Sequence, residues 1–333
     1  MSISTESPAA AQAASSSLFS ILSTVAADAS SLADLLSPTL AAYDYRTELY
    51  ERDGAEKVDI CLPGRPPLTT PRHKSGKVFH RENRPIGSLE PAATAVMDAI
   101  MDRVPMDSFL DIGASNGYFG FLAATHPAPP GGAPIAAHCF EMSDLQFGRM
   151  QALAAEHGVE NLHAHLSGMS DAPRGEKQIW YSVTKMFESE PPPRAYRDNI
   201  FIRIKFLLRG RVNRDVLRTA MVRIDSIDAF VERHGIAPGI VKIDVDGYEV
   251  KVVPGGMETF ARHRPVLFLE LHRYRMLAPQ GGDRRSVVDP LFDLGYRALL
   301  IDNHRDLPTA RLRAVEPDDP AFAKDATELF IFV

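Results

Sequence analysis

The chain has 333 residues, of which 45% are hydrophobic and 24% charged, a composition that excludes collagen-like, coiled-coil and fully disordered proteins. Its formal net charge is −6, from 37 Lys and Arg against 43 Asp and Glu, so no nucleic-acid partner is expected. Two cysteines are too few for a disulfide framework, no basic residue precedes Arg46, and no apolar run approaches about 18 residues, so we expect a cytoplasmic protein without a transmembrane span.

The N-terminal part is expected to be accessory to the main fold. Residues 1–17 are mostly Ser and Ala and predict a disordered tail. Apolar residues recur at helical spacing over residues 18–50, which predicts two short helices that either cap a pocket or form a homodimer contact. Residues 53–91 are rich in Pro, Gly and basic side chains and predict an irregular connector. We therefore interpret residues 18–90 as a helical and irregular accessory segment and residues 91–333 as the principal domain.

From residue 108 onward, short apolar segments alternate with amphipathic ones, which is typical of a parallel sheet with helices on both faces. Strands are expected at 108–112, 135–140, 162–166, 239–245, 265–271, 296–302 and 327–333. Helices are expected at 91–103, 117–125, 143–157, 226–234, 255–263 and 284–294. The last two strands leave no room for a long crossover, so they are expected to pair as an antiparallel edge.

The first candidate site is the glycine-containing turn after the first strand. Gly113 and Gly117 would let the backbone approach a ligand closely, with free N–H groups at the helix start facing it. The spacing is not the G-x-G-x-x-G of a dinucleotide fingerprint. Asp111, two residues before Gly113, suits the cationic amino group of S-adenosylmethionine (SAM) better than a pyrophosphate.

Further residues extend this candidate cofactor site. Glu141, at the end of the next strand, can accept hydrogen bonds from both ribose hydroxyls. Ser115 and Tyr118 belong to the same turn and are also candidate cofactor contacts. The alternative is that the acids only cap helices or lie on the surface.

The second candidate site lies where two later strands end. Asp244 and Asp246 follow one strand, and Glu270 and His272 follow the next, at the edge where α/β sheets bind ligands. Methyl transfer to a weak alcohol nucleophile benefits from a general base, and His272 is the first candidate, with Asp244 or Glu270 orienting it. An Mg²⁺ or Ca²⁺ site on the same acids, or a structural ion-pair network that includes Lys242, stays open.

The combined motifs resemble the FkbM family of SAM-dependent methyltransferases over about residues 108–300. The segments that carry the resemblance are FLDIGASNGYFG, FEM, VRIDSID, VKIDVDGYE, LFLELHR and LGY. The family pattern is D-I-G-A-N-x-G-Y, F-E-P, T-L-D, K-I-D-V-E-G and E-x-H. Ser115 replaces its Asn, Met142 its Pro and Asp246 its Glu, so any metal or substrate contact through Asp246 uses a shorter acid.

The resemblance implies an α/β, Rossmann-like class I methyltransferase sheet, seven-stranded and mostly parallel with an antiparallel last strand. It also implies SAM as cofactor, without a required divalent metal, and O-methylation of a carbohydrate or secondary metabolite. Asp111, Gly113 and Gly117 correspond to the SAM turn, and Glu141 corresponds to the ribose acid. A catalytically silent scaffold in glycan assembly is the alternative function, and an NAD-dependent oxidoreductase is disfavoured by the glycine spacing.

Residues 188–218 form a basic insertion that departs from the family pattern. Its basic side chains, among them Arg203 and Lys205, alternate with apolar ones. It could be a lid that recognises an anionic acceptor, or a peripheral membrane contact over residues 197–218. A solvated basic face or a subunit contact is the third interpretation.

Overall fold

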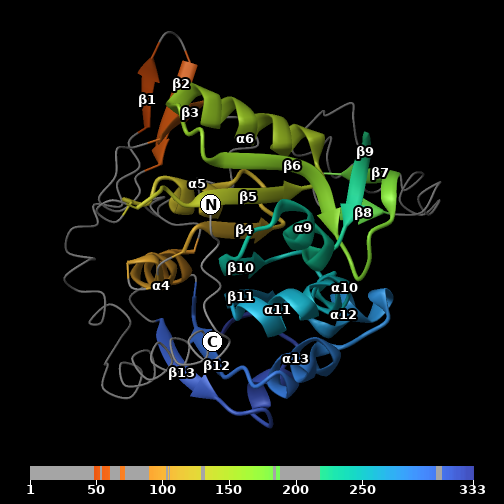
Figure 1. Ribbon diagram of the computed structural model, residues 1–333. Coiled ribbons are helices and arrows are strands. Elements are labelled where there is room, and N and C mark those ends of the chain that lie inside the picture. The colour runs from red at the N-terminus through yellow and green to blue at the C-terminus, as the bar shows by residue number, and fades with distance from the viewer. Residues whose placement is uncertain are drawn as a thin grey trace, which may run out of the picture.

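The computed structural model describes residues 49–52, 55–60, 68–71, 90–102, 104, 106–128, 132–182, 185–187, 218–304 and 310–333 (Figure 1). The tail expected at 1–17, the helices expected over 18–48 and most of the basic insertion, 188–217, lie outside these residues. Within the described ranges, none of the helices combines the length and hydropathy that a membrane span requires.

The described strands form an eleven-stranded sheet and a separate three-stranded sheet. The large sheet has the order β13–β12–β14–β11–β10–β4–β5–β6–β9–β7–β8. Its strands are β4 Ser108–Ile112, β5 Ala136–Glu141, β6 Leu162–Met169, β7 Gly175–Ser182, β8 Lys185–Phe187, β9 Arg218–Asp225, β10 Pro238–Ile243, β11 Val266–Leu271, β12 Ala298–Asp302, β13 Arg311–Val315 and β14 Glu328–Phe332.

The inner part of this sheet has the expected class I methyltransferase arrangement. Strands β11, β10, β4, β5 and β6 are parallel to one another, and β14 is antiparallel to both β11 and β12. The seven strands expected from the sequence are all present, and β7, β8, β9 and β13 extend the sheet beyond them. The predicted fold class is confirmed, with a larger sheet than expected.

The last two expected strands do pair antiparallel, but β13, which was not expected, lies outside them. β14 does pair antiparallel with β12, but it inserts between β12 and β11, and β13 covers the far side of β12. Its residues Phe330, Ile331 and Phe332 are fully buried. A strand that is apolar on both faces belongs inside a sheet, because an edge strand usually keeps one polar face.

Helices cover both faces of the sheet, as expected (Figure 1). The helices that pack on one face are α4 Pro91–Met101, α5 Tyr118–Ala124 and α6 Asp144–His157. The other face carries α9 Ile227–His234, α10 Glu249–Val252, α11 Met257–His263, α12 Tyr274–Leu277 and α13 Arg284–Asp293. Short 3-10 turns lie at Pro254–Gly256, Ala278–Gln280 and Pro320–Ala323.

The predicted helix boundaries have the expected physical causes. Ser143 caps α6 by accepting a hydrogen bond from the Gln146 amide, and Gly158 ends the helix in the left-handed conformation. Ser226 and Gly235 do the same for α9. Glycine is favoured at such ends because it adopts positive φ without a steric penalty.

The connector expected to be irregular over residues 53–91 contains regular structure. Strands β2 Ala55–Ile60 and β3 Leu68–Pro71 lie in it and form the small antiparallel sheet with β1 Leu49–Arg52, which begins at the end of the segment expected to be helical over residues 18–50. The proline and glycine content of this segment indicated turns, but it did not reveal the short strands between them.

Candidate active site

The glycine turn between β4 and α5 is shaped by close packing. Gly113 has φ +83°, and a Cβ there would lie 1.9 Å from the Asp244 carbonyl oxygen. Gly117 has φ +80°, and its Cβ would lie 2.6 Å from Met150 Sδ. Gly113 therefore requires glycine because of the neighbouring backbone and its positive φ, and Gly117 because of its positive φ, whereas the sequence pattern had suggested the approach of a ligand.

The amides of this turn are mostly used within the protein. The Gly113 and Ala114 N–H groups both donate to the Phe140 carbonyl at 3.0 Å, and the Gly117 N–H donates to Ala114 at 2.8 Å. These three N–H groups are therefore used within the protein, and a ligand contact by free N–H groups at the helix start stays a prediction. The hydrogen bonds instead fasten the turn to the end of β5.

Glu141 and Ser115, two of the predicted cofactor-site residues, lie in direct contact. The Glu141 carboxylate accepts hydrogen bonds from the Ser115 N–H at 2.8 Å and from the Ser143 N–H at 2.7 Å. Burial raises the pKa of Glu141, and these N–H donors oppose the rise. Because each carboxylate oxygen can accept a second hydrogen bond, Glu141 keeps acceptor capacity for hydroxyl groups of a ligand.

Tyr118 does not join this group. Its hydroxyl lies 3.0 Å from Thr94 Oγ1 of α4, and its side chain is buried in the core. Its side chain therefore does not face Glu141 and Ser115, and the expected cofactor contact through Tyr118 stays a prediction. Tyr118, the first residue of α5, thus packs between α5 and α4.

Asp111 and Lys242 lie side by side on β4 and β10. Lys242 Nζ is 3.8 Å from Asp111 Oδ1 and 3.4 Å from Asp244 Oδ2. Asp111 is only 1% exposed, and neither of its oxygens has a hydrogen-bond partner among the described residues. Burial raises its pKa to about 6, although the charge of Lys242 lowers it. Lys242 is itself buried beside these acids, in an arrangement that resembles the ion-pair network considered in the sequence analysis.

His272 lies among carboxylates at the end of β11. Its Nδ1 is 2.6 Å from Glu249 Oε1, and its Nε2 is 3.4 Å from Asp246 and 3.9 Å from Asp244. Burial alone would lower its pKa, but the hydrogen bonds to Asp246 and Glu249 and the nearby charges raise it to about 11. His272 is thus an imidazolium at neutral pH, which is the wrong protonation state for the general base expected from the sequence.

Asp244 and Asp246 differ in exposure. The Asp244 side chain is 30% exposed, whereas that of Asp246 is 80% exposed and projects from a turn with φ +52°. Although burial raises the pKa of Asp244, the charges of Lys242 and His272 bring it below its usual value. Asp244 is therefore an ionised carboxylate at the border between core and solvent.

Three polar residues at this edge were not singled out from the sequence. Glu249 is fully buried at the start of α10, and its Oε1 lies 2.6 Å from His272 Nδ1. Its position directly after a predicted strand and turn could have marked it as a site residue. Glu90 precedes α4 and His304 follows β12, and both are buried. No local pattern marks these two, because only the sheet order brings them to the same edge.

Two sets of potential metal ligands occur among the described residues, and they share Glu270. One consists of Asp244, Glu270 and His272, and the other of Glu90, Glu270 and His304. In each set, the potential ligand atoms lie within 4.8 Å of one another. Arg203 and Lys205, the expected acceptor contacts, lie outside the described residues.

Comparison with known proteins identifies the domain. Residues 142–298 match the family of the methyltransferase FkbM domain. This range begins directly after Glu141 and includes Asp244, Glu270 and His272. No curated protein matches the sequence.

Solved structures of methyltransferases show distant similarity. Methyltransferase FkbM from Methylobacillus flagellatus KT is 14% identical with a TM-score of 0.38, over 70% of this chain and 46% of that one. Precorrin-6y C5,15-methyltransferase from Geobacter metallireducens GS-15 is 12% identical with a TM-score of 0.33, over 77% and 95% of the two chains. A SAM-dependent methyltransferase from Geobacter sulfurreducens in complex with S-adenosyl-L-homocysteine is 13% identical with a TM-score of 0.32, over 73% and 89%. This chain thus spans about half the length of the Methylobacillus protein, and TM-scores this low carry no argument about the site.

The strand order is that of the class I methyltransferase fold, and the family match supports a methyltransferase. More particularly, the match over residues 142–298 is to the methyltransferase FkbM domain.

Proposed function

We propose that the protein is an O-methyltransferase that transfers a methyl group from SAM to a hydroxyl of a carbohydrate or secondary metabolite. The observation that carries this proposal is the polar edge at the carboxyl ends of β4, β5, β10 and β11. Asp111 and Glu141 lie on its β4–β5 side, and Asp244, Glu270 and His272 on its β10–β11 side. In open α/β sheets this edge is where ligands bind.

The residues of the β4–β5 side fit SAM. The two buried Asp111 oxygens without hydrogen-bond partners create a negative potential beneath the glycine turn, which favours a cationic ligand. Glu141 is fixed by Ser115 and Ser143 and can accept hydrogen bonds from ribose hydroxyls. Bound SAM supplies a methyl group on a positively charged sulfur.

On the β10–β11 side, we assign proton acceptance to Asp244 instead of His272. Asp244 is the partly exposed, ionised carboxylate, whereas His272 already carries a proton. Asp244 takes the proton of the acceptor hydroxyl as the new O–C bond forms and the S–C bond breaks. His272 and Lys242 hold Asp244 in place, and they also make it a weak base. Orientation of the hydroxyl therefore contributes more to the rate than proton removal.

The chemistry of this edge favours an acceptor with several hydroxyl groups. Carboxylates accept hydrogen bonds and do not donate them when ionised. Asp244, Asp246 and Glu270 therefore suit a polyol such as a sugar. Recognition of an anionic acceptor would depend on the basic insertion and stays an expectation.

Transfer from methyl-labelled SAM to a panel of oligosaccharides and to cell extract tests the function. We expect a labelled product that yields an O-methyl sugar, or an O-methyl ether of another metabolite, on hydrolysis and mass spectrometry. Asp244→Asn should lower kcat at least 100-fold, since it removes the base and keeps the shape, whereas the exposed control Glu160→Gln should retain full activity. Label found only on nitrogen or carbon would refute O-methylation, and no transfer to any acceptor would favour the scaffold.

A further inference from the structure

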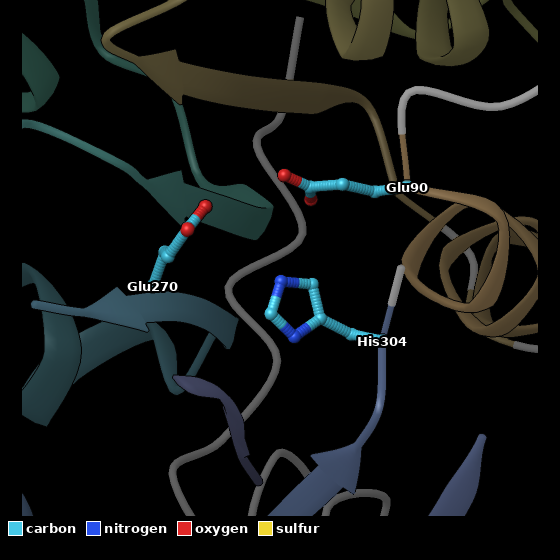
Figure 2. Close-up of side chains that lie close together, drawn as sticks. All are labelled: Glu90, Glu270 and His304. Carbon is cyan, nitrogen blue, oxygen red and sulfur yellow. The ribbon is translucent and has the colours of Figure 1, made fainter. Parts of the chain in front are cut away.

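Three buried side chains from distant parts of the chain converge beside the polar edge. Glu90 lies just before α4, Glu270 is on β11, and His304 follows β12. Their relative exposures are 5%, 3% and 7%. Figure 2 shows the two carboxylates and the imidazole ring pointing toward one another from these three elements. The arrangement lies beyond the residues assigned to methyl transfer, apart from Glu270.

The backbone holds two of these residues together. The Ala92 N–H, in the first turn of α4, donates to the His304 carbonyl at 3.4 Å. Glu90 occupies the N-cap position of α4, yet its side chain does not cap the helix. An acid at a helix start ordinarily accepts from the first free amides. Here the carboxylate is directed toward Glu270 and His304 instead.

The three donors have the geometry and chemistry of a metal-binding set. Their potential ligand atoms all lie within 4.8 Å of one another. Bonds of about 2.0–2.2 Å to a common ion place ligand atoms roughly 3–4 Å apart, so small side-chain movements would suffice. Two carboxylates and one imidazole suit Mn²⁺ or Zn²⁺, since Mg²⁺ and Ca²⁺ prefer oxygen ligands alone.

The charges nearby supply an independent reason for a cation. The Lys242 ammonium lies within 4 Å of Asp111 and Asp244, and the charges of Glu90 and Glu270 also act on it. Several carboxylates thus lie around this buried lysine. Asp111 in addition has both oxygens buried without a hydrogen-bond partner among the described residues. Buried negative charge is costly unless it is compensated, and a divalent ion would compensate it.

We propose that Glu90, Glu270 and His304 form a binding site for a divalent transition metal ion, Mn²⁺ or Zn²⁺. The ion links the start of α4 and the end of β12 to β11. Because the three ligands come from separate elements and are buried, metal binding stabilises the folded chain. The proposal does not depend on methyl transfer, since metal binding is measured without SAM or acceptor.

Metal binding to the full chain, first freed of metal with a chelator, tests this proposal. Mn²⁺ binding is followed by electron paramagnetic resonance and Zn²⁺ binding by calorimetry. We expect one ion per chain and a higher Tm when the ion is present. Glu90→Gln and His304→Gln should each weaken metal binding at least 100-fold. The loss of a residue that only orients a ligand already lowers metal affinity 10–100-fold, and these two variants remove a ligand itself. The exposed control Glu258→Gln and the matched control His263→Gln should bind as the wild type does.

Variants of the second candidate ligand set, Asp244, Glu270 and His272, distinguish the two possible metal sites. Asp244→Asn and His272→Gln remove two ligands of the other candidate set and should leave Mn²⁺ affinity within about threefold of wild type. If these two variants lose the ion while Glu90→Gln and His304→Gln keep it, the site proposed here is wrong. Absence of Mn²⁺ and Zn²⁺ binding at millimolar concentration would also overturn it, and SAM binding by the same preparation would show that the methyltransferase proposal stands independently.

Discussion

Acidification should destabilise this protein through a cluster of histidines on β5, β6 and α9. His138 Nδ1 lies 3.2 Å from His165 Nε2, and the rings of His163 and His234 lie close to His138. Burial, together with the charges of the neighbouring histidines, lowers the pKa of His138 to about 3 and that of His165 to about 4. Arg233 also lowers the pKa of His165.

The sign and size of the effect follow from these pKa values. Both folded-state pKa values lie below the ordinary 6.5, so the unfolded chain binds more protons between these limits. The contribution of these two histidines to stability is therefore complete above pH 6.5 and falls as the pH drops from there. At pH 5, protonation in the unfolded chain costs the fold about 2 kcal/mol per histidine, at 1.36 kcal/mol per pH unit. Part of the pKa shift of His138 comes from the charge of His165, so the two contributions cannot simply be added. We expect the two histidines together to lower the free energy of unfolding by about 2–4 kcal/mol.

Urea unfolding followed by circular dichroism at pH 7.5 and pH 5.0 measures this loss. His138→Phe replaces the central ring with one that suits its aromatic neighbours Phe140 and Phe230, and it should reduce the pH-dependent loss by at least half. The half-buried control His157→Gln, which lies outside the cluster, should leave the loss unchanged. Equal pH dependence in wild type and His138→Phe would refute the assignment of the effect to this cluster.

Three other outcomes follow from the site. Gly113→Ala should lower the free energy of unfolding by several kcal/mol, since its Cβ would meet the Asp244 carbonyl at 1.9 Å and its φ is +83°, and thermal unfolding measures this. Tyr118→Phe should cost about 1 kcal/mol of stability through its lost contact with Thr94 and leave the Kd for SAM unchanged in calorimetry; a weaker Kd would return Tyr118 to the cofactor site. His272→Gln should lower kcat about 10–100-fold with unchanged SAM affinity, because it positions Asp244; unchanged kcat in a steady-state assay would exclude that role.

The features that were predictable from the sequence have local causes. The seven inner strands and the caps of α6 and α9 follow from apolar patterns and from Ser and Gly at the expected positions. The meeting of Glu141 with Ser115 was also predictable, because β4 and β5 are adjacent and each delivers its turn to the same edge.

The features that were missed depend on tertiary contacts. The inner position of β14 is set by burial on both faces, and the need for glycine at position 113 comes from the β10 loop. The protonated state of His272 depends on Glu249 in the next short helix. Glu90 and His304 are 214 residues apart in the sequence, and no periodicity connects them.

Titration of SAM into the purified protein by calorimetry tests the central claim most directly. The account predicts binding of one SAM per chain, at least tenfold weaker in Asp111→Asn and in Glu141→Gln and unchanged in Glu160→Gln. A wild-type protein that does not bind SAM at high micromolar concentration, or an equal affinity in all four proteins, would contradict it.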